Sequence, residues 1–216
     1  MALSWIFLDL DGTLVDVARR YHRLHGAFVV SQGCRPLRFA DYWPAKRERV
    51  PEPELMQRAG LSPEAADWAA TSRLRWIEDQ RYLRLDRPWS WTVPVLDDLA
   101  RRAPLVLVTL RRYPDLLHWQ LGRLGLTPYF QRVLAGRSNG KPEAKARLIR
   151  KEEFPGLERS VFVGDTEVDI ASGQALGIRT VAVASGLRTT AHLAAWNPDA
   201  LFEDLREVPS WLDSLD

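Results

Sequence analysis

The sequence predicts a doubly wound α/β fold: a parallel, Rossmann-like sheet with an all-helical segment inserted after its first strand. An apolar run at residues 5–8 is typical of a buried parallel strand. Further short apolar runs alternate with helical patterns from residue 92 onward, which favours parallel strands joined by right-handed crossovers. Between them, residues 17–90 show only helical patterns. A chain of 216 residues can bury such a core and carry one insertion.

The first predicted strand, residues 5–8, runs into two carboxylates, Asp9 and Asp11. Gly12 follows and allows a sharp turn. In open α/β sheets, ligands bind at the carboxyl ends of the strands, so this position favours chemistry. An ordinary solvated Asp-Gly turn is an equal alternative for this stretch alone, because both residues are common in turns.

The insertion is expected to consist of helices only. Residues 16–31 have apolar positions at helical spacing, and the prolines of residues 32–62 restrict that stretch to short helices. Ser62 as N-cap and Pro63 at the first turn predict the start of one long helix that runs to about residue 85. The expected domains are therefore a core of residues 1–16 and 91–216 and a helical domain of residues 17–90. Four tryptophans are expected to be mainly core: Trp43, Trp68, Trp76 and Trp89.

After the insertion, helices and strands alternate. The predicted helices are residues 92–102, 113–125, 141–151 and 166–177. The predicted strands are residues 104–110, 131–136, 160–165 and 179–186. Pro142 suits the first turn of its helix, which puts Lys141 at the helix mouth. The tail, with an apolar pair at residues 201–202 and a final helix, is expected to pack on the sheet edge.

Composition excludes several classes of protein. With 46% hydrophobic and 27% charged residues, the chain is typical of a soluble globular protein. Its one cysteine, Cys34, excludes an internal disulfide framework and a cysteine metal cluster. The N-terminus lacks the pattern of a signal peptide or a membrane span, so we expect cytoplasmic residence and no membrane partner.

The net charge of +2 is too small to indicate nucleic-acid binding, but the charge is unevenly distributed. Residues 17–90 carry 14 basic against 9 acidic side chains, and the rest of the chain carries 16 against 19. A positive segment above a carboxylate-bearing one suits an anionic substrate. Solvated arginines on helix faces are an equally good explanation.

Polar residues at four strand ends fit one reaction, attack on a phosphate monoester. They are Asp9, Asp11, Thr109, Lys141 and Asp165, with Asp169 four residues beyond Asp165 on the same helix face. An aspartate can form the mixed anhydride, and a second carboxylate can protonate the leaving alkoxide. Hydroxyl, amide and ammonium groups hold phosphoryl oxygens, and Mg²⁺, commonly held by carboxylates, offsets their charge.

Four stretches resemble the motifs of the haloacid dehalogenase superfamily, in the same order: DLDGTLVD, Thr109, Gly140-Lys141-Pro142 and GDTEVD. The resemblance covers nearly the whole chain and points to the branch of phosphoglycolate phosphatase and β-phosphoglucomutase. It implies that residues 17–90 form a cap domain that closes over the leaving group.

The resemblance also implies a role for each motif residue. Asp9 would be the nucleophile and Asp11 the general acid and then base. Phosphate-binding groups would be Gly12, Thr109, Leu110 and Lys141. Mg²⁺ ligands would be Asp9, the backbone carbonyl of Asp11, Asp165 and Asp169.

Several assignments stay open at the level of sequence. Lys145 is the runner-up to Lys141 as the motif lysine, since it begins an apolar helical pattern. Arg111 or its neighbour Arg112 either contacts substrate or starts a surface helix. Within the insertion, the basic residues considered as substrate contacts are Arg20, Arg23 and Lys46.

The expected function is that of a Mg²⁺-dependent phosphatase acting on a small phosphorylated metabolite, as a monomer or a homodimer. One alternative is a phosphosugar mutase with the same site. Another is a protein that binds a phosphometabolite or a partner and turns over little. The presence of Asp11 argues against the dehalogenases and phosphonatases of the superfamily, which the resemblance implies lack this second aspartate.

Overall fold

The computed structural model describes residues 3–215. The chain divides into two compact units. One unit comprises residues 3–16 and 88–215, and the other comprises residues 17–87. The short strands β2 (Val15–Asp16) and β3 (Arg87–Pro88) lie at the points where the chain leaves one unit for the other. Residues 88–90 thus group with the first unit, and a cap role for the second stays a prediction.

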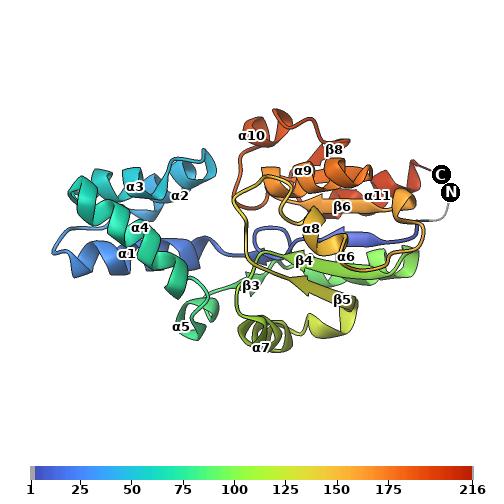
Figure 1. The fold of residues 1–216 in the computed structure, drawn as a ribbon, viewed down its shortest axis with the longest axis horizontal. Coiled ribbons are helices and arrows are strands. Elements are labelled where there is room, and N and C mark those ends of the chain that lie inside the picture. The colour runs from blue at the N-terminus through green and yellow to red at the C-terminus, as the bar shows by residue number, and fades with distance from the viewer. Residues whose placement is uncertain (1–2, 216) are drawn as a thin grey trace. The chain divides into compact units, whose positions relative to one another are not determined.

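The first unit contains a six-stranded sheet in the order β5-β4-β1-β6-β7-β8 (Figure 1). The strands are β1 (Ile6–Leu8), β4 (Leu105–Thr109), β5 (Phe130–Ala135), β6 (Val161–Gly164), β7 (Arg179–Val183) and β8 (Ala200–Phe202). Every neighbouring pair is parallel. The apolar runs of β1, β4 and β6 are fully buried because these strands occupy the centre of the sheet.

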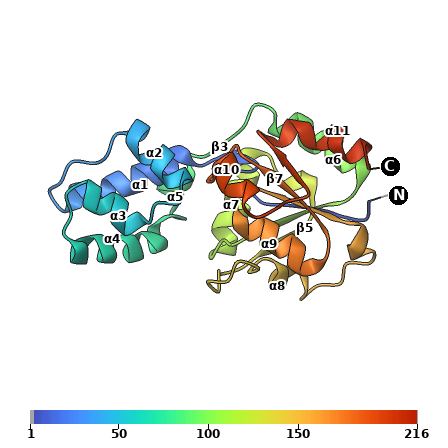
Figure 2. The same ribbon diagram turned by 90° about the horizontal axis from the view of Figure 1, so that it is seen from above.

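Helices cover both faces of this sheet. They are α6 (Thr92–Arg102), α7 (Pro114–Leu124), α8 (Ala146–Ile149), α9 (Glu167–Leu176), α10 (Thr190–Ala194) and α11 (Val208–Asp213). Figure 2 shows α8 and α9 on one face and α6 and α11 on the other. The predicted doubly wound sheet is confirmed.

The strand order places a topological switch point beside β1. From β1 the chain proceeds to β4 and β5 on one side, and then returns to β6 on the other side. The connections after β1 and β6 therefore diverge, and in open α/β sheets ligands bind outside the carboxyl ends of the strands at such a point. Asp9 follows β1 and Asp165 follows β6, so both flank this point.

One helix of this unit is shorter than expected. The helix predicted for residues 141–151 is reduced to α8, and residues 142–145 form turns before it. The chain is held in local turns just upstream, where Ser138 Oγ accepts a hydrogen bond from the Gly140 amide and Asn139 Oδ1 accepts one from the Lys141 amide. Pro142 is therefore not at a helix start.

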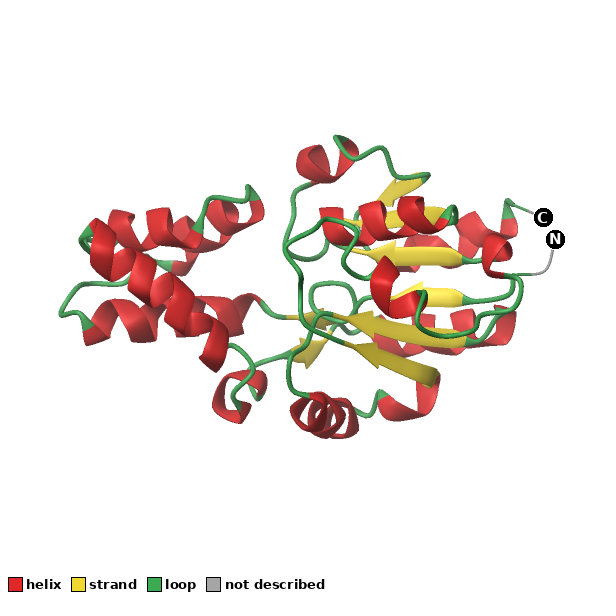
Figure 3. Ribbon diagram, viewed as in Figure 1, coloured by secondary structure: helices red, strands yellow, loops and turns green. Residues whose placement is uncertain are grey.

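The second unit is built from helices (Figure 3). They are α1 (Ala18–Ser31), α2 (Phe39–Arg47), α3 (Glu52–Arg58), α4 (Pro63–Trp76) and α5 (Gln80–Leu83). The long helix expected from Pro63 is broken after Trp76, because Asp79 caps a new helix by accepting a hydrogen bond from the Arg81 amide. The prediction of buried tryptophans is wrong for two of them, since Trp68 is 54% and Trp76 43% exposed. None of the described helices is both long and apolar enough to cross a membrane.

A buried ion cluster around Glu52 holds the helical unit together. The Glu52 carboxylate lies 2.9 Å from Lys46 Nζ, 3.4 Å from His25 Nδ1 and 3.7 Å from an Arg73 nitrogen. Burial alone would raise the pKa of Glu52, but Arg73, His25 and Lys46 together hold that pKa well below its usual range. The cluster therefore stabilises the ionised carboxylate.

Two basic residues expected to contact substrate are instead internal to this unit. Lys46 is an ion-pair partner of Glu52. Arg20 is 1% exposed and lies 3.2 Å from the buried carboxylate of Asp86. The substrate assignment of Lys46 and Arg20 is therefore corrected, because their charges are directed into the helical unit. Arg23, on α1, remains exposed.

We predict that Glu52→Gln lowers the free energy of unfolding by about 3 kcal/mol at pH 7, because it leaves buried cations without their carboxylate. The folded-state pKa of Glu52 is lowered, so its stabilisation is complete above the unfolded-state pKa of about 4.3 and is lost as the pH falls through the folded-state value. The difference between wild type and variant should therefore shrink below about pH 4. Urea unfolding at several pH values measures it.

The matched control is Glu54→Gln on the same helix, where the carboxylate is exposed and pairs with Arg58. This substitution should lower the free energy of unfolding by less than about 1 kcal/mol at every pH. Equal losses for the two variants would contradict the stabilising role of the buried cluster.

Candidate active site

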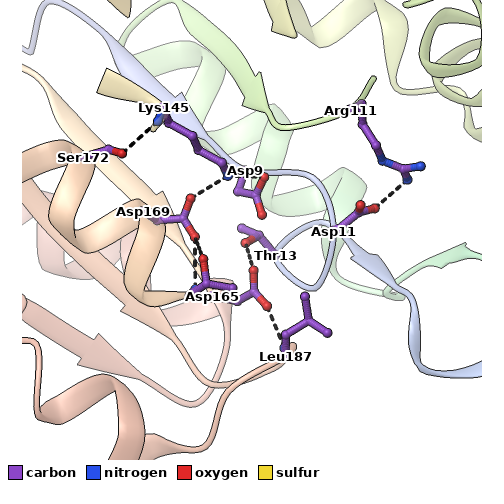
Figure 4. Close-up of polar contacts among 10 residues, drawn as sticks. Asp9, Asp11, Thr13, Arg111, Lys145, Asp165, Asp169, Ser172 and Leu187 are labelled. Atoms are coloured by element: carbon purple, nitrogen blue, oxygen red, sulfur yellow. Dashed lines mark hydrogen bonds and ion pairs between the residues drawn. The ribbon is translucent and has the colours of Figure 1, made fainter. Parts of the chain in front are cut away.

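Three buried aspartates meet at the switch point of the sheet. Asp9 follows β1, Asp165 follows β6 and Asp169 lies in the first turn of α9. Each offers a carboxylate oxygen, and these oxygens lie within 4.8 Å of one another. The three side chains belong to residues that are at most 5% exposed. The structure thus brings together the three aspartates whose side chains the sequence assigned to a metal site (Figure 4).

The start of α9 fixes the orientation of Asp169. Thr166 is the N-cap. The Thr166 amide and hydroxyl donate hydrogen bonds to Asp169 Oδ2, at 3.0 Å and 2.7 Å. This capping box leaves Asp169 Oδ1 for another partner. Gly164 allows the close approach, because a Cβ at that position would collide with the Asp169 side chain.

The partner of Asp169 Oδ1 is Lys145. Its Nζ lies 2.6 Å from Asp169 Oδ1 and 2.5 Å from Asp9 Oδ1. Its amide donates to Ser172 Oγ at 3.1 Å, which ties the start of α8 to α9. Burial alone would lower the pKa of Lys145, but Asp169 and Asp9 raise it above its usual range. Lys145 is therefore a fixed cation between two carboxylates.

The sequence-based preference for Lys141 is corrected by these positions. Lys141 is exposed, whereas Lys145 is 3% exposed and contacts Asp9. The preference relied on the resemblance of Gly140-Lys141-Pro142 to the phosphoglycolate phosphatase branch, with Pro142 expected at a helix start. In the structure, residues 142–145 form turns and the helix starts at Ala146. Lys145, the runner-up, occupies the position expected of the motif lysine.

Asp165 is held by groups from two loops. Its Oδ2 accepts a hydrogen bond from the Leu187 amide at 2.6 Å, and its Oδ1 accepts one from Thr13 Oγ1 at 3.2 Å (Figure 4). Gly12, at φ +91°, and Gly186 pack against this carboxylate so closely that a Cβ on either would collide with it. Gly12 thus lies beside the site, and its role in phosphate binding stays a prediction.

Sequence reasoning missed three contributors to the site: the Thr13 hydroxyl, the Ser172 hydroxyl and the Leu187 amide. A signal existed for the loop that carries Leu187, because Ser185 and Gly186, typical turn residues, end the segment 179–186 that was predicted as a strand. Ser185 joins this loop to the turn at Gly12, because Ser185 Oγ donates a hydrogen bond to the Gly12 carbonyl at 2.9 Å. No comparable signal marks Ser172, which lies mid-helix.

The charges of the cluster suit a divalent cation. Burial raises the pKa of Asp9 to about 7, with Asp169 and Asp11 adding to the effect and Lys145 opposing it. Burial and the neighbouring Asp9 and Asp169 raise the pKa of Asp165 well above its usual range. Three carboxylates against one ammonium leave two excess negative charges. An all-oxygen set with this charge fits Mg²⁺.

Asp11 faces a different partner. Its Oδ1 lies 2.7 Å from an Arg111 nitrogen, and the same nitrogen donates to Gln120 Oε1 of α7 at 3.0 Å. Arg111 is 4% exposed. The structure therefore gives Arg111, expected to contact substrate, a contact with Asp11 (Figure 4). The two carboxylates that leave β1 together are thus separated into two environments.

The remaining predicted residues follow β4. Thr109 ends the strand and is 2% exposed. Leu110 comes next, and its side chain packs against the core that includes Val108 and Phe162. Thr109 and Leu110 are thus at the carboxyl edge of a strand that neighbours β1, as expected.

The comparison with protein families matches residues 3–177 to the model for haloacid dehalogenase-like hydrolases. This chain belongs to that family. The hydrolase is 27% identical over 214 residues to phosphoglycolate phosphatase of Rhodobacter capsulatus, covering 97% of this chain and 96% of that protein. It is 25% identical over 211 residues to pyrophosphatase PpaX of Oceanobacillus iheyensis, covering 96% of both.

The solved structures agree on the fold. A haloacid dehalogenase-like family protein from Streptococcus pneumoniae matches with a TM-score of 0.74 at 22% identity, covering 97% of this hydrolase and 98% of that chain. The predicted family and the prediction of a hydrolytic enzyme are confirmed.

We predict that Lys145→Gln lowers the free energy of unfolding by about 3 kcal/mol at pH 8 without divalent cations, because three buried carboxylates lose their cation. Lys141→Gln, at the exposed alternative, should change it by less than about 0.5 kcal/mol. Urea unfolding of both variants measures this. A larger loss for Lys141→Gln would restore the original preference for that lysine.

Proposed function

We propose that this hydrolase is a Mg²⁺-dependent phosphatase that hydrolyses a small phosphomonoester through an aspartyl-phosphate on Asp9. The coarser class, a phosphohydrolase, follows from the family and from relatives named phosphoglycolate phosphatase and pyrophosphatase. The observation that carries the finer proposal is the buried Asp9 carboxylate, held by Lys145 Nζ at 2.5 Å beside Asp165 and Asp169.

The proposed cation site consists of the carboxylates of Asp9, Asp165 and Asp169, with the backbone carbonyl of Asp11. Two excess negative charges in a buried cluster support this assignment, as does the donor set of oxygen atoms alone. When bound, Mg²⁺ would offset the repulsion between the nucleophilic carboxylate and the substrate phosphate.

The proposed first step is attack of an Asp9 oxygen on phosphorus. A bond forms between that oxygen and phosphorus, the ester bond breaks, and the leaving oxygen takes a proton from Asp11. Lys145 fixes the Asp9 carboxylate through Oδ1, so that the nucleophile does not rotate freely. Thr109 and Lys145 would hold phosphoryl oxygens, together with the Leu110 amide. The Gly12 amide, also expected in this role, donates instead to the Val15 carbonyl at 2.9 Å.

In the proposed second step, water attacks the phosphorus of the aspartyl-phosphate. Asp11, now ionised, accepts the proton of that water, phosphate leaves, and the Asp9 carboxylate is restored. Arg111 acts as a positioning residue, because its contact with Asp11 Oδ1 and Gln120 sets the direction of the Asp11 carboxylate. This positioning role replaces the substrate contact that the sequence suggested for Arg111.

The same residues would serve transfer to a sugar hydroxyl, so the phosphosugar mutase remains the alternative within this site. It differs only in the acceptor. Analysis of products separates the two, since a phosphatase releases inorganic phosphate and a mutase returns an isomeric sugar phosphate. A binding protein of low turnover would release phosphate no faster than the Asp9→Asn variant.

We predict that Asp9→Asn lowers phosphate release at least about a thousandfold, because an amide oxygen is a poor nucleophile and the variant keeps its shape. The assay is a screen of sugar phosphates, phosphoglycolate, nucleotides and phosphoamino acids with Mg²⁺ and with a chelator. Lys141→Gln is the control and should retain activity within about twofold, in keeping with its exposed position. The proposal would be overturned if wild type released phosphate at an undiminished rate with the chelator and if Asp9→Asn released it as fast as wild type.

We predict that Arg111→Gln lowers kcat/KM, which reports formation of the aspartyl-phosphate, about tenfold or more on an alkyl phosphate and much less on 4-nitrophenyl phosphate. The nitrophenolate leaves without a proton, so it depends little on the direction of Asp11. Arg112→Gln, the neighbouring side chain, is the control. Equal losses of kcat/KM on both substrates would assign Arg111 a structural role only.

A further inference from the structure

An exposed stripe on α4 is the strongest unexplained surface feature of the helical unit. It comprises Asp67, Trp68, Thr71, Leu74 and Arg75, which recur at helical spacing along one face. Trp68 is 54% exposed and Leu74 39% exposed. The stripe borders a hollow of about 460 Å³ lined by Asp67, Trp68, Thr71, Ser72 and Arg75. A large aromatic side chain exposed beside a hollow is typical of an interaction surface.

The aromatic groups of this surface are held in place within the unit. The Trp68 ring packs edge-on against Phe28 of α1, with ring centroids 5.9 Å apart. The Arg81 guanidinium lies 4.8 Å from the centroid of Trp76, and Asp79 holds that guanidinium at 3.0 Å. Side chains already ordered in this way lose little conformational entropy on binding.

The stripe is self-complementary about Thr71. Asp67 and Arg75 lie four residues on either side of it, and Trp68 and Leu74 lie three residues on either side. If two copies of α4 pack antiparallel about a two-fold axis next to Thr71, Asp67 of each copy comes level with Arg75 of the other. Trp68 of each copy likewise comes level with Leu74 of the other. The small Thr71 side chain allows the two helices to approach closely where they cross.

The charges favour this arrangement over others. Asp67 and Arg75 are too far apart along the helix to pair with each other, and neither has an ion-pair partner among residues 3–215 of its own chain. A parallel pair of helices would bring Asp67 against Asp67, which is repulsive. One acidic and one basic group on the same face fit a second copy of the face better than a uniformly charged partner.

We propose that the α4 stripe is an isologous interface between two copies of this chain. Neighbouring apolar surface extends it, because a second hollow of about 300 Å³ is lined by Phe28, Trp68, Trp76 and Tyr82, among others. A stable homodimer buries roughly 800 Å² on each partner, which requires more than one helix, so the interface would include the adjoining faces of α1 and α5.

The test is the oligomeric state of the full chain, measured by sedimentation equilibrium at roughly 1–100 µM, a range that covers weak and moderate homodimers. We expect a dimer for wild type. Asp67→Arg and Arg75→Asp each place two like-charge pairs in the interface, so each should raise the dissociation constant at least tenfold. The double variant Asp67→Arg with Arg75→Asp restores opposite charges and should recover most of that loss. Trp68→Ala should also dissociate the dimer.

The control is Glu54→Arg on α3, which changes an exposed charge outside the stripe and should leave the dissociation constant unchanged. Circular dichroism establishes that each variant stays helical. A wild-type monomer throughout this range overturns the proposal. So does a dimer that the single variants leave intact, or a double variant that stays as dissociated as the single ones. These readouts do not depend on activity, so they are independent of the proposed function.

Discussion

The contact of the buried Lys145 ammonium with Asp9 and Asp169 is the interaction on which the site depends. Parallel strands bring carboxylates from β1 and β6 to one edge, where they would repel one another. Lys145 supplies the one fixed positive charge of the cluster, and it is tied to α9 through Ser172. Because the three carboxylates outnumber this one ammonium, burial and mutual repulsion raise the pKa of Asp9 and of Asp165, and a bound proton or cation would offset that repulsion.

The backbone around the cluster explains how Asp9 and Asp11 acquire different roles. Gly12 and Gly186 let two loops approach the Asp165 carboxylate. In the loop that contains Gly12, the Asp11 side chain contacts Arg111 rather than the cluster. Asp9 is thus buried among carboxylates with a raised pKa, whereas Asp11 is held by a guanidinium. The role of Asp9 as nucleophile requires its ionised form, which a cation bound beside Asp165 and Asp169 would favour by offsetting their charge.

Local patterns predicted the sheet, its central strands and the aspartates at the ends of β1 and β6, because burial and strand direction are encoded in short apolar runs. Lys145 was ranked second because Gly140-Lys141-Pro142 resembles the motif of the phosphoglycolate phosphatase branch, whereas only the folded chain shows that α8 starts at Ala146. The contact between Arg111 and Asp11 joins residues 100 positions apart and has no local signal. The exposure of Trp68 depends on helix packing, which periodicity alone does not determine.

The most direct test of the central claim is mass spectrometry of the protein quenched in acid during turnover of its best substrate. The proposed mechanism predicts a phosphoryl group on the peptide that contains Asp9, lost in Asp9→Asn and not replaced elsewhere. A phosphoryl group on a different residue would contradict the nucleophilic role of Asp9. If the kinetics show that a covalent intermediate accumulates, the absence of a phosphoryl group from the peptide that contains Asp9 would contradict that role as well.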